Sequence, residues 1–183
     1  MGHLVGIAGS LRQSSYNAAL LRAAAELAPD GTRIEIATLA GIPLYDGDLE
    51  SREGIPEAVA RLKDTIAAAS GLLLATPEYN NSMPGVFKNA IDWLSRPPGD
   101  IGRVFGGKPV ALMGATPGAG GTRLGQAAWL PVLRVLGTRP WYGKSLYVGQ
   151  AAQMFDSNWR LQDEKTRKAL QGFVTGFVTF IGP

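Results

Sequence analysis

The apolar residues of the chain fall into short runs that alternate with segments of helical spacing. Four runs are apolar enough to be strands and a fifth is weaker: 3–9, 33–39, 71–77, 108–117 and 144–149. The run at 33–39 alternates apolar and polar residues, which is typical of an edge or half-exposed strand. The runs at 71–77 and 108–117 are apolar on both faces, as strands covered on two sides are.

Between these runs, apolar residues recur every three or four positions, the spacing of amphipathic helices. This spacing predicts helices over 17–28 and 56–69, and another that begins after Pro84, a proline suited to a first turn. A fourth helix, predicted to bend at Pro131, is expected to bury the face that carries Leu124, Ala128, Val132 and Val135. A final stripe over 170–181 is expected to serve the core or a subunit contact.

The alternation of strands and helices predicts an α/β fold, an open doubly wound parallel sheet with helices on both faces and right-handed crossovers. At 183 residues, with no repeat and no linker, the chain is expected to form one domain over 1–183. The segments 41–54 and 96–107 are rich in turn residues and are expected to be loops.

Composition narrows the class of protein. Hydrophobic residues make up 45% and charged residues 18%, as in ordinary globular proteins. The sequence has no apolar run long enough to cross a bilayer, no signal pattern and no cysteine, which predicts a cytoplasmic protein without membrane partner or metal site. The first 60 residues hold four Lys/Arg against eight Asp/Glu, and the remainder is net basic, but no dense basic run suggests nucleic acid.

Three polar or glycine-rich segments directly follow three of the predicted strands. They are "GSLRQSSYN" (9–17), "TPEYNNSMPG" (76–85) and "ATPGAGGTR" (115–123). In doubly wound sheets, ligands bind outside the carboxyl ends of the strands, where the strand order reverses. The three segments are therefore expected to converge on one crevice.

The first of these segments has the properties of a phosphate site. It leads into a helix, whose free N–H groups and dipole favour an anion, and Ser10, Arg12, Ser15 and Asn17 add hydrogen bonds or charge. For Ser15 or Asn17 alone, a simple helix cap is an equally good interpretation. No Gly-Lys-Ser/Thr follows and the dinucleotide fingerprint is incomplete, so a mononucleotide such as FMN fits best.

The other two segments suit a flat heterocycle. Tyr79 offers an aromatic wall, although a packing role is as compatible with the sequence. Gly118, Gly120 and Gly121 allow the backbone to approach a ligand closely, although a glycine cluster is also typical of a plain turn.

These segments resemble the NADPH-dependent FMN reductase family of flavodoxin-like proteins, which includes bacterial quinone, chromate and azo-dye reductases. The resemblance lies in 9–17, 76–96 and 107–121, in family order and at family spacing. It implies a flavodoxin-like five-stranded sheet of order 2-1-3-4-5 and one non-covalent FMN. It also implies a homodimer or homotetramer, with the helix over 88–94 near the subunit contact.

The resemblance also implies a set of site residues. Ser10, Arg12, Ser15 and Asn17 would hold the FMN phosphate. Pro77, Glu78, Tyr79 and Asn80 would line the isoalloxazine ring, mainly through main-chain groups, and Thr116, Pro117 and Gly118 would close over its other side. Arg123 lies three residues before Gln126, whereas relatives often place an arginine two before, and it is given no role.

The function expected from this resemblance is FMN-dependent NAD(P)H oxidoreduction by a ping-pong route. NADPH or NADH would reduce the flavin at N5, and a small acceptor such as a quinone, azo compound, chromate or free flavin would reoxidise it. No catalytic side chain is predicted, since the cofactor performs the chemistry. The single histidine, His3, is expected at the opposite end of the sheet.

Two alternatives belong to other classes. A flavodoxin-type electron carrier would bind FMN without turning over a small substrate, but such carriers are usually strongly acidic and this chain has a net charge of +3. A serine hydrolase would need a Gly-x-Ser-x-Gly elbow, which the sequence lacks.

Overall fold

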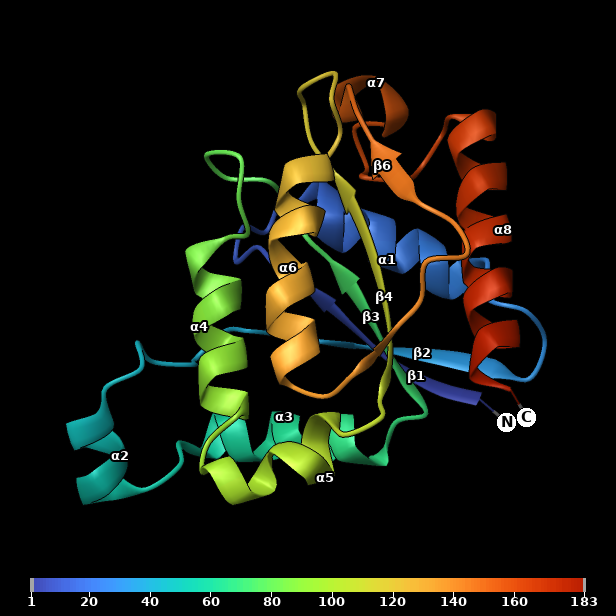
Figure 1. The fold of residues 1–183 in the computed structure, drawn as a ribbon. Coiled ribbons are helices and arrows are strands. Elements are labelled where there is room, and N and C mark those ends of the chain that lie inside the picture. The colour runs from blue at the N-terminus through green and yellow to red at the C-terminus, as the bar shows by residue number, and fades with distance from the viewer. Residues whose placement is uncertain (1, 183) are drawn as a thin grey trace.

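A computed structural model describes residues 2–182 and shows an open parallel sheet between two layers of helices (Figure 1). The strand order is β2-β1-β3-β4-β5, with β6 also paired to β4, and every pairing is parallel. The predicted doubly wound class and strand order are therefore confirmed. The strands are β1 (Gly2–Ala8), β2 (Thr32–Ala37), β3 (Gly71–Ala75), β4 (Pro109–Ala115), β5 (Arg139–Pro140) and β6 (Leu146–Val148).

Helices cover both faces of the sheet and enclose two cores. One core lies under α1 and α8 and contains Leu20, Phe173 and Phe177, and the other lies under α3, α4 and α6. The helices are α1 (Tyr16–Glu26), α2 (Gly47–Glu53), α3 (Glu57–Ala68), α4 (Gly85–Leu94), the 3-10 helix η1 (Pro98–Asp100), α5 (Ile101–Phe105), α6 (Arg123–Val135), α7 (Ala151–Met154) and α8 (Glu164–Ile181).

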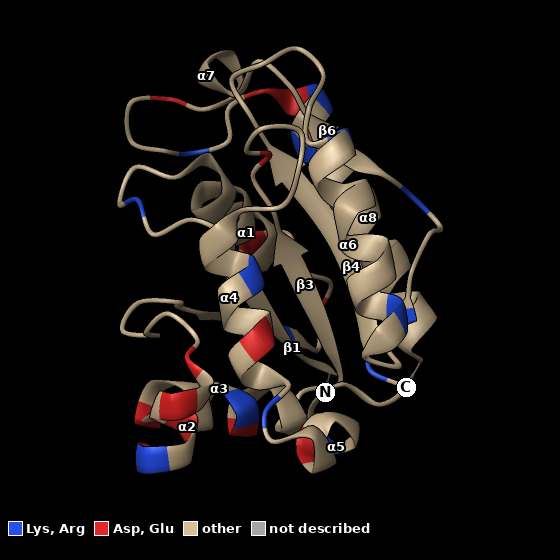
Figure 2. Cartoon of the chain, turned by 60° about the vertical axis from the view of Figure 1, so that its left-hand side comes forward, with Lys and Arg blue, Asp and Glu red and all other residues tan. Residues whose placement is uncertain are grey.

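Both segments predicted to be loops contain short helices. Asp46 caps α2 by accepting from the Asp48 N–H at 2.9 Å, and η1 and α5 lie within 96–107. Helix α2 was missed because it buries no residue and therefore shows no apolar face in the sequence, and α5 was missed because its five residues, although they include the buried Val104 and Phe105, are too few to show a period. Acidic residues gather on α2, coloured red in Figure 2, and this helix protrudes at the lower left of the molecule (Figures 1 and 2).

Burial of the strands follows the predicted pattern with one exception. All of β3 is buried, and β4 is buried except for a half-buried Leu112. In the edge strand β2, Ile34 is buried but Ile36 is 42% exposed, so the predicted alternation holds only in part. Among residues 2–182, no helix has the length and apolar character that a bilayer span requires.

The fifth position of the sheet is divided between two short strands. Val110 pairs with Pro140 in β5, and Met113 pairs with Leu146 in β6, with 141–145 intervening. The N–H groups of Arg139 and Trp141 donate to the Lys108 and Val110 carbonyls, both at 2.8 Å, so the nitrogen of Pro140 faces the outer edge of the sheet, where no ladder bond is needed. The sheet thus has six strands, where five were predicted.

Helix α6 is rotated from its predicted orientation. Leu124 and Val135 are 52% and 78% exposed, and the buried residues are instead Gly125, Gln126, Trp129 and Leu133. Trp129 sets this orientation, because its ring packs edge-on against Phe87 at 4.8 Å between centroids and is fully buried. The sequence spacing did not reveal that a glycine and a tryptophan would form the inner face.

Candidate cofactor site

The three polar loops meet in one cleft at the carboxyl ends of β1, β3 and β4. The cleft has a volume of about 130 Å³. It confirms the predicted convergence, although Asn80 and Gly118 do not line it. The lining residues are Ser10, Arg12, Ser14, Ser15, Tyr16, Asn17, Pro77, Glu78, Tyr79, Ala115, Thr116 and Pro117.

The start of α1 forms one wall of this cleft. Ser15 is the N-cap, and its Oγ accepts from the Ala18 N–H at 3.3 Å, so the capping interpretation is correct for this residue. A hydroxyl both accepts and donates, so capping leaves the Ser15 proton for an anion. The first turn of α1 contains no acidic residue, and Arg12 is exposed beside it. The positive end of the helix dipole is therefore uncompensated on this wall.

Asn17 has a structural task that the sequence did not reveal. Its side-chain amide donates to the Ala115 carbonyl and accepts from the Ala115 N–H, both at 2.9 Å, and the residue is 3% exposed. These two bonds tie the first turn of α1 to the end of β4. Asn17 does not cap α1, since the N-cap is Ser15, and because it also lines the cleft, its role as a phosphate ligand stays a prediction.

The second loop ends in a tight turn. Tyr79 and Ser82 exchange backbone hydrogen bonds at 3.0 Å, and the two residues between them, Asn80 and Asn81, have φ values of 50° and 60°. Two consecutive positive φ angles define a type I′ turn, which asparagine tolerates well. Tyr79 is 45% exposed, so it does not pack in the core, and its contact with a ligand stays a prediction.

The hydrogen bonds of this loop limit its main-chain donors. Pro77 has no N–H, and the Tyr79 N–H donates to Ser82. Within the described part of the chain, the N–H groups of Glu78 and Asn80 have no backbone acceptor. These two are therefore the main-chain donors that 77–80 can offer to a flat ligand.

The third loop is anchored to the end of β6 and to the segment that follows it. The Thr116 N–H donates to the Val148 carbonyl at 2.9 Å, and the Gly118 carbonyl accepts from the Gln150 N–H at 3.0 Å. A Cβ at Gly118 would meet nothing within 4 Å, so this glycine faces open space. Gly121 has a φ of 68°, and a Cβ there would lie 2.7 Å from the Tyr147 Cβ, so only glycine fits.

Three lining residues were not among the predicted ones: Ser14, Tyr16 and Ala115. Ser14 adds a hydroxyl to the α1 wall. Its position directly before Ser15 in the sequence could have pointed to it as a further phosphate ligand. The Tyr16 ring packs against Trp159 and Phe155 at centroid distances of 5.0 and 5.6 Å. This packing holds the first turn of α1 against the segment that carries Phe155 and Trp159, a contact that no local sequence pattern predicts.

The residues of the cleft fit a mononucleotide better than other ligands. Hydroxyls, a guanidinium and the open end of a helix gather at one wall, which suits a phosphate group. The small volume accommodates that end of a ligand, while a larger ring would extend over the adjacent loops. His3 lies at the opposite end of β1, where Nε2 is 3.1 Å from a Glu35 carboxylate oxygen. Among residues 2–182, no three His, Asp or Glu side chains gather as a metal site.

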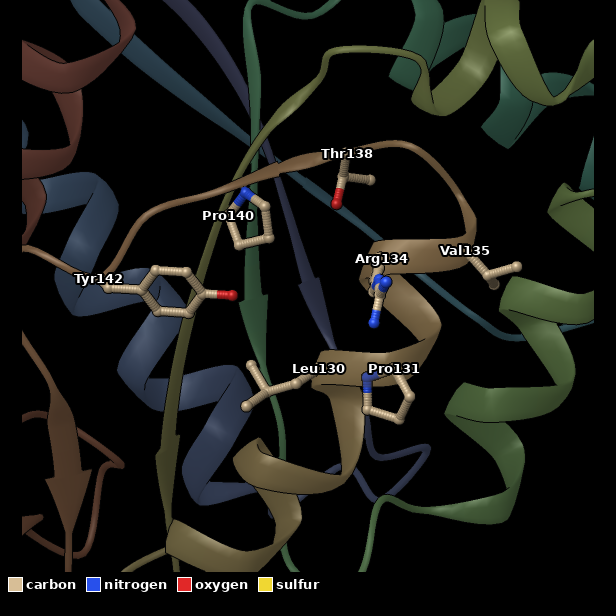
Figure 3. Close-up of a pocket in the computed structure, with 7 residues that line it drawn as sticks. All are labelled: Leu130, Pro131, Arg134, Val135, Thr138, Pro140 and Tyr142. Carbon is tan, nitrogen blue, oxygen red and sulfur yellow. The ribbon is translucent and has the colours of Figure 1, made fainter.

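A second cleft lies on the outer side of α6 and has a different character. Its volume is about 840 Å³, and Figure 3 shows Tyr142 reaching across it toward Leu130. The walls are mostly apolar and Arg134 is the one charged residue that lines it. It lies away from the strand-end loops and brings no set of polar groups together.

The fold and the strand-end cleft together define a flavodoxin-like protein that binds a phosphorylated planar cofactor. The family model for NADPH-dependent FMN reductase matches residues 3–153, and the chain belongs to this family. The predicted family, its oxidoreductase class and FMN as its cofactor are thereby confirmed, whereas nothing supports the electron-carrier alternative.

Individual relatives match over nearly the whole chain. An NAD(P)H-dependent FMN reductase from Pseudomonas aeruginosa is 46% identical, covering 92% of this chain and 89% of the relative. A 2-hydroxy-1,4-benzoquinone reductase from a Burkholderia species is 40% identical, covering 96% of this chain and 93% of the relative. The solved structure of FerB, a flavoenzyme NAD(P)H:(acceptor) oxidoreductase from Paracoccus denitrificans, is 38% identical, with a TM-score of 0.87 over 99% and 97% of the two chains.

Proposed function

We propose that the protein is an FMN-dependent NAD(P)H:quinone oxidoreductase. The observation that carries the proposal is the convergence of three strand-end loops on one cleft whose α1 wall is rich in anion-binding groups. Bound FMN supplies the hydride and electron transfer, which explains why no acid–base side chain is needed. The quinone is favoured as acceptor because relatives at 39–40% identity over most of the chain are named quinone reductases.

The residues of the chain hold and orient the cofactor. Ser10, Ser14 and Ser15 donate hydroxyl hydrogen bonds to the phosphate, Arg12 adds a charged pair, and the N–H groups of the first turn of α1 complete the site. The N–H groups of Glu78 and Asn80 serve the polar edge of the ring. Tyr79, Thr116 and Pro117 flank it, and Gly118 leaves space for a second planar molecule to approach.

The subunit arrangement is a separate part of the proposal. A homodimer or homotetramer with α4 near the contact is supported by Leu44, which is 82% exposed on a segment fastened to that helix. Asn89 fastens it by donating to the Pro43 carbonyl and accepting from the Tyr45 N–H, both at 2.8 Å. We place the enzyme in the cytoplasm, where NAD(P)H is available. Light scattering on a sizing column measures the assembly, and Leu44→Asp should reduce it to monomers.

The function is tested by anaerobic reduction and reoxidation. FMN-loaded protein is mixed with NADPH or NADH, and loss of flavin absorbance is followed; benzoquinone is then added. Prompt bleaching and prompt return of the colour are expected. A yellow protein that neither nicotinamide bleaches would instead support a carrier, and return of colour only with an azo dye, chromate or free FMN would reassign the acceptor.

A further inference from the structure

Helix α6 begins at the same end of the sheet as α1 but has no cap of its own. Thr122 occupies the N-cap position, yet its side chain makes no capping hydrogen bond. Its hydroxyl accepts from the Gln126 amide at 2.9 Å instead. The first turn of α6 also contains no acidic residue. The N–H groups at the start of this helix therefore need a partner from elsewhere.

Glu78 provides that partner from the second loop of the cofactor site. Its Oε2 accepts from the Gly125 N–H at 2.8 Å, and Gly125 is the third residue of α6, the usual recipient of a capping side chain. A carboxylate in this position also compensates the positive end of the helix dipole. The cap of α6 thus lies 47 residues away in the chain.

The loop and the helix approach closely at this contact. A Cβ at Gly125 would lie 3.1 Å from the Pro77 carbonyl oxygen and 3.3 Å from the Glu78 Cα, which is tighter than ordinary van der Waals contact, so glycine suits this close approach. One turn further along α6, the Trp129 indole N–H donates to the Thr76 hydroxyl at 3.1 Å. The two contacts hold the start of the loop against one face of the helix.

Beyond these contacts the loop closes in a tight turn. The type I′ turn over 79–82 is closed by two backbone hydrogen bonds between Tyr79 and Ser82, both at 3.0 Å. The Glu78 carboxylate is the side-chain link nearest to this turn. The backbone N–H of Glu78 is one of the two free main-chain donors described above. The bond from the Glu78 carboxylate to α6 therefore holds in place a residue that can donate to the flavin ring.

We propose that Glu78 is a positioning residue, which caps α6 from the flavin loop and thereby holds 77–80 in place for the ring. The inference rests on the FMN site proposed above. The side chain does not contact the ring in this assignment. The Glu78 carboxylate bonds to the start of α6, so its negative charge lies there and not at the start of α1, where the cofactor phosphate would bind.

A purely structural cap would stabilise α6 without affecting the loop, and two variants separate these roles. Glu78→Ala removes both the charge and the link between loop and helix. Adding Leu124→Glu to it restores an acidic residue in the first turn of α6, at an exposed position, but does not restore the link. Glu78→Gln keeps an acceptor for the Gly125 N–H, and Glu57→Ala is a matched loss of an acid from the start of α3.

The first measurement is amide hydrogen exchange of the segment 76–83 in the flavin-free proteins, which needs no cofactor. Exchange is expected to quicken in Glu78→Ala, to stay fast in the double variant although its melting temperature recovers, and to remain near wild type in Glu78→Gln. Unchanged exchange in Glu78→Ala, or full recovery in the double variant, would overturn the positioning role. Glu57→Ala should leave this segment unaffected.

The second measurement is FMN affinity, followed by quenching of flavin fluorescence. Glu78→Ala should weaken FMN binding about 10- to 100-fold, and Glu78→Gln should recover most of it. If the double variant binds FMN as wild type does, Glu78 is a structural cap and the proposal fails. If wild type itself binds no FMN, the proposed function fails, and the exchange measurement still decides whether Glu78 holds the loop.

Discussion

The starts of α1 and α6 lie at the same end of the sheet but are completed in opposite ways. Ser15 caps α1 with a neutral hydroxyl, and Asn17 fastens its first turn to Ala115 with a neutral amide. Glu78 both caps and fastens α6 with a carboxylate. The dipole of α6 is therefore compensated by the protein, whereas that of α1 is left for a ligand. Of these two helix starts, only that of α1 is left without a negative charge from the chain, and it is the one that lines the cleft.

The strongest way to break this contrast is to give α1 a carboxylate of its own. Ser14→Glu places a negative charge beside the cleft wall, where repulsion of a phosphate should cost about 2–4 kcal/mol. FMN affinity should fall about 30- to 1,000-fold, measured by fluorescence titration. Ser14→Gln is the matched neutral control and should bind FMN well. Equal affinity of both variants would remove the phosphate from this wall.

Removal of the positive charge beside α1 should have the next largest effect. Arg12→Ala deletes a charge-assisted pair that contributes about 1.5–3 kcal/mol, so FMN affinity should fall about 10- to 150-fold. The stability of the flavin-free protein should not change, because Arg12 is exposed. Arg22→Ala, further along the same helix, controls for general charge. Undiminished flavin retention in Arg12→Ala would show that this residue is not a ligand.

Loss of the neutral link tests the other half of the contrast. Asn17→Ala leaves the Ala115 N–H and carbonyl without their side-chain partner, which should cost about 1–3 kcal/mol of unfolding free energy. Urea unfolding of the flavin-free protein measures this, with the exposed Gln13→Ala as control. A midpoint equal to that of wild type would mean that the two bonds do not hold α1 to β4.

The smallest effect is expected where α6 meets the loop. Gly125→Ala puts a Cβ 3.1 Å from the Pro77 oxygen, so the gain in helix propensity should be outweighed and stability should fall by about 1 kcal/mol. Gly102→Ala in α5, where a Cβ meets nothing within 4 Å, should instead gain stability. Thermal melts of both variants make the comparison. A stabilised Gly125→Ala would show that loop and helix can separate at no cost.

The sequence predicted the features that depend on local patterns. Continuous apolar runs located the buried strands β3 and β4, and polar segments after strands located the cleft at their ends. It could not predict the partners of Asn17 and Glu78, because each bonds a backbone group far away in the chain, 98 and 47 residues distant. The rotation of α6 was missed for the same reason, since Trp129 responds to Phe87 and Thr76 rather than to neighbours on its helix.

The division between β5 and β6 has a consequence for how copies of the protein meet. An uninterrupted outer strand would present a long row of free backbone donors and acceptors, on which another chain could form a continuous ladder. Here that margin consists of segments of two and three residues, one of them containing a proline. This border therefore offers little template for intermolecular β-structure, in contrast to the six-residue edge strand β2 on the other side of the sheet.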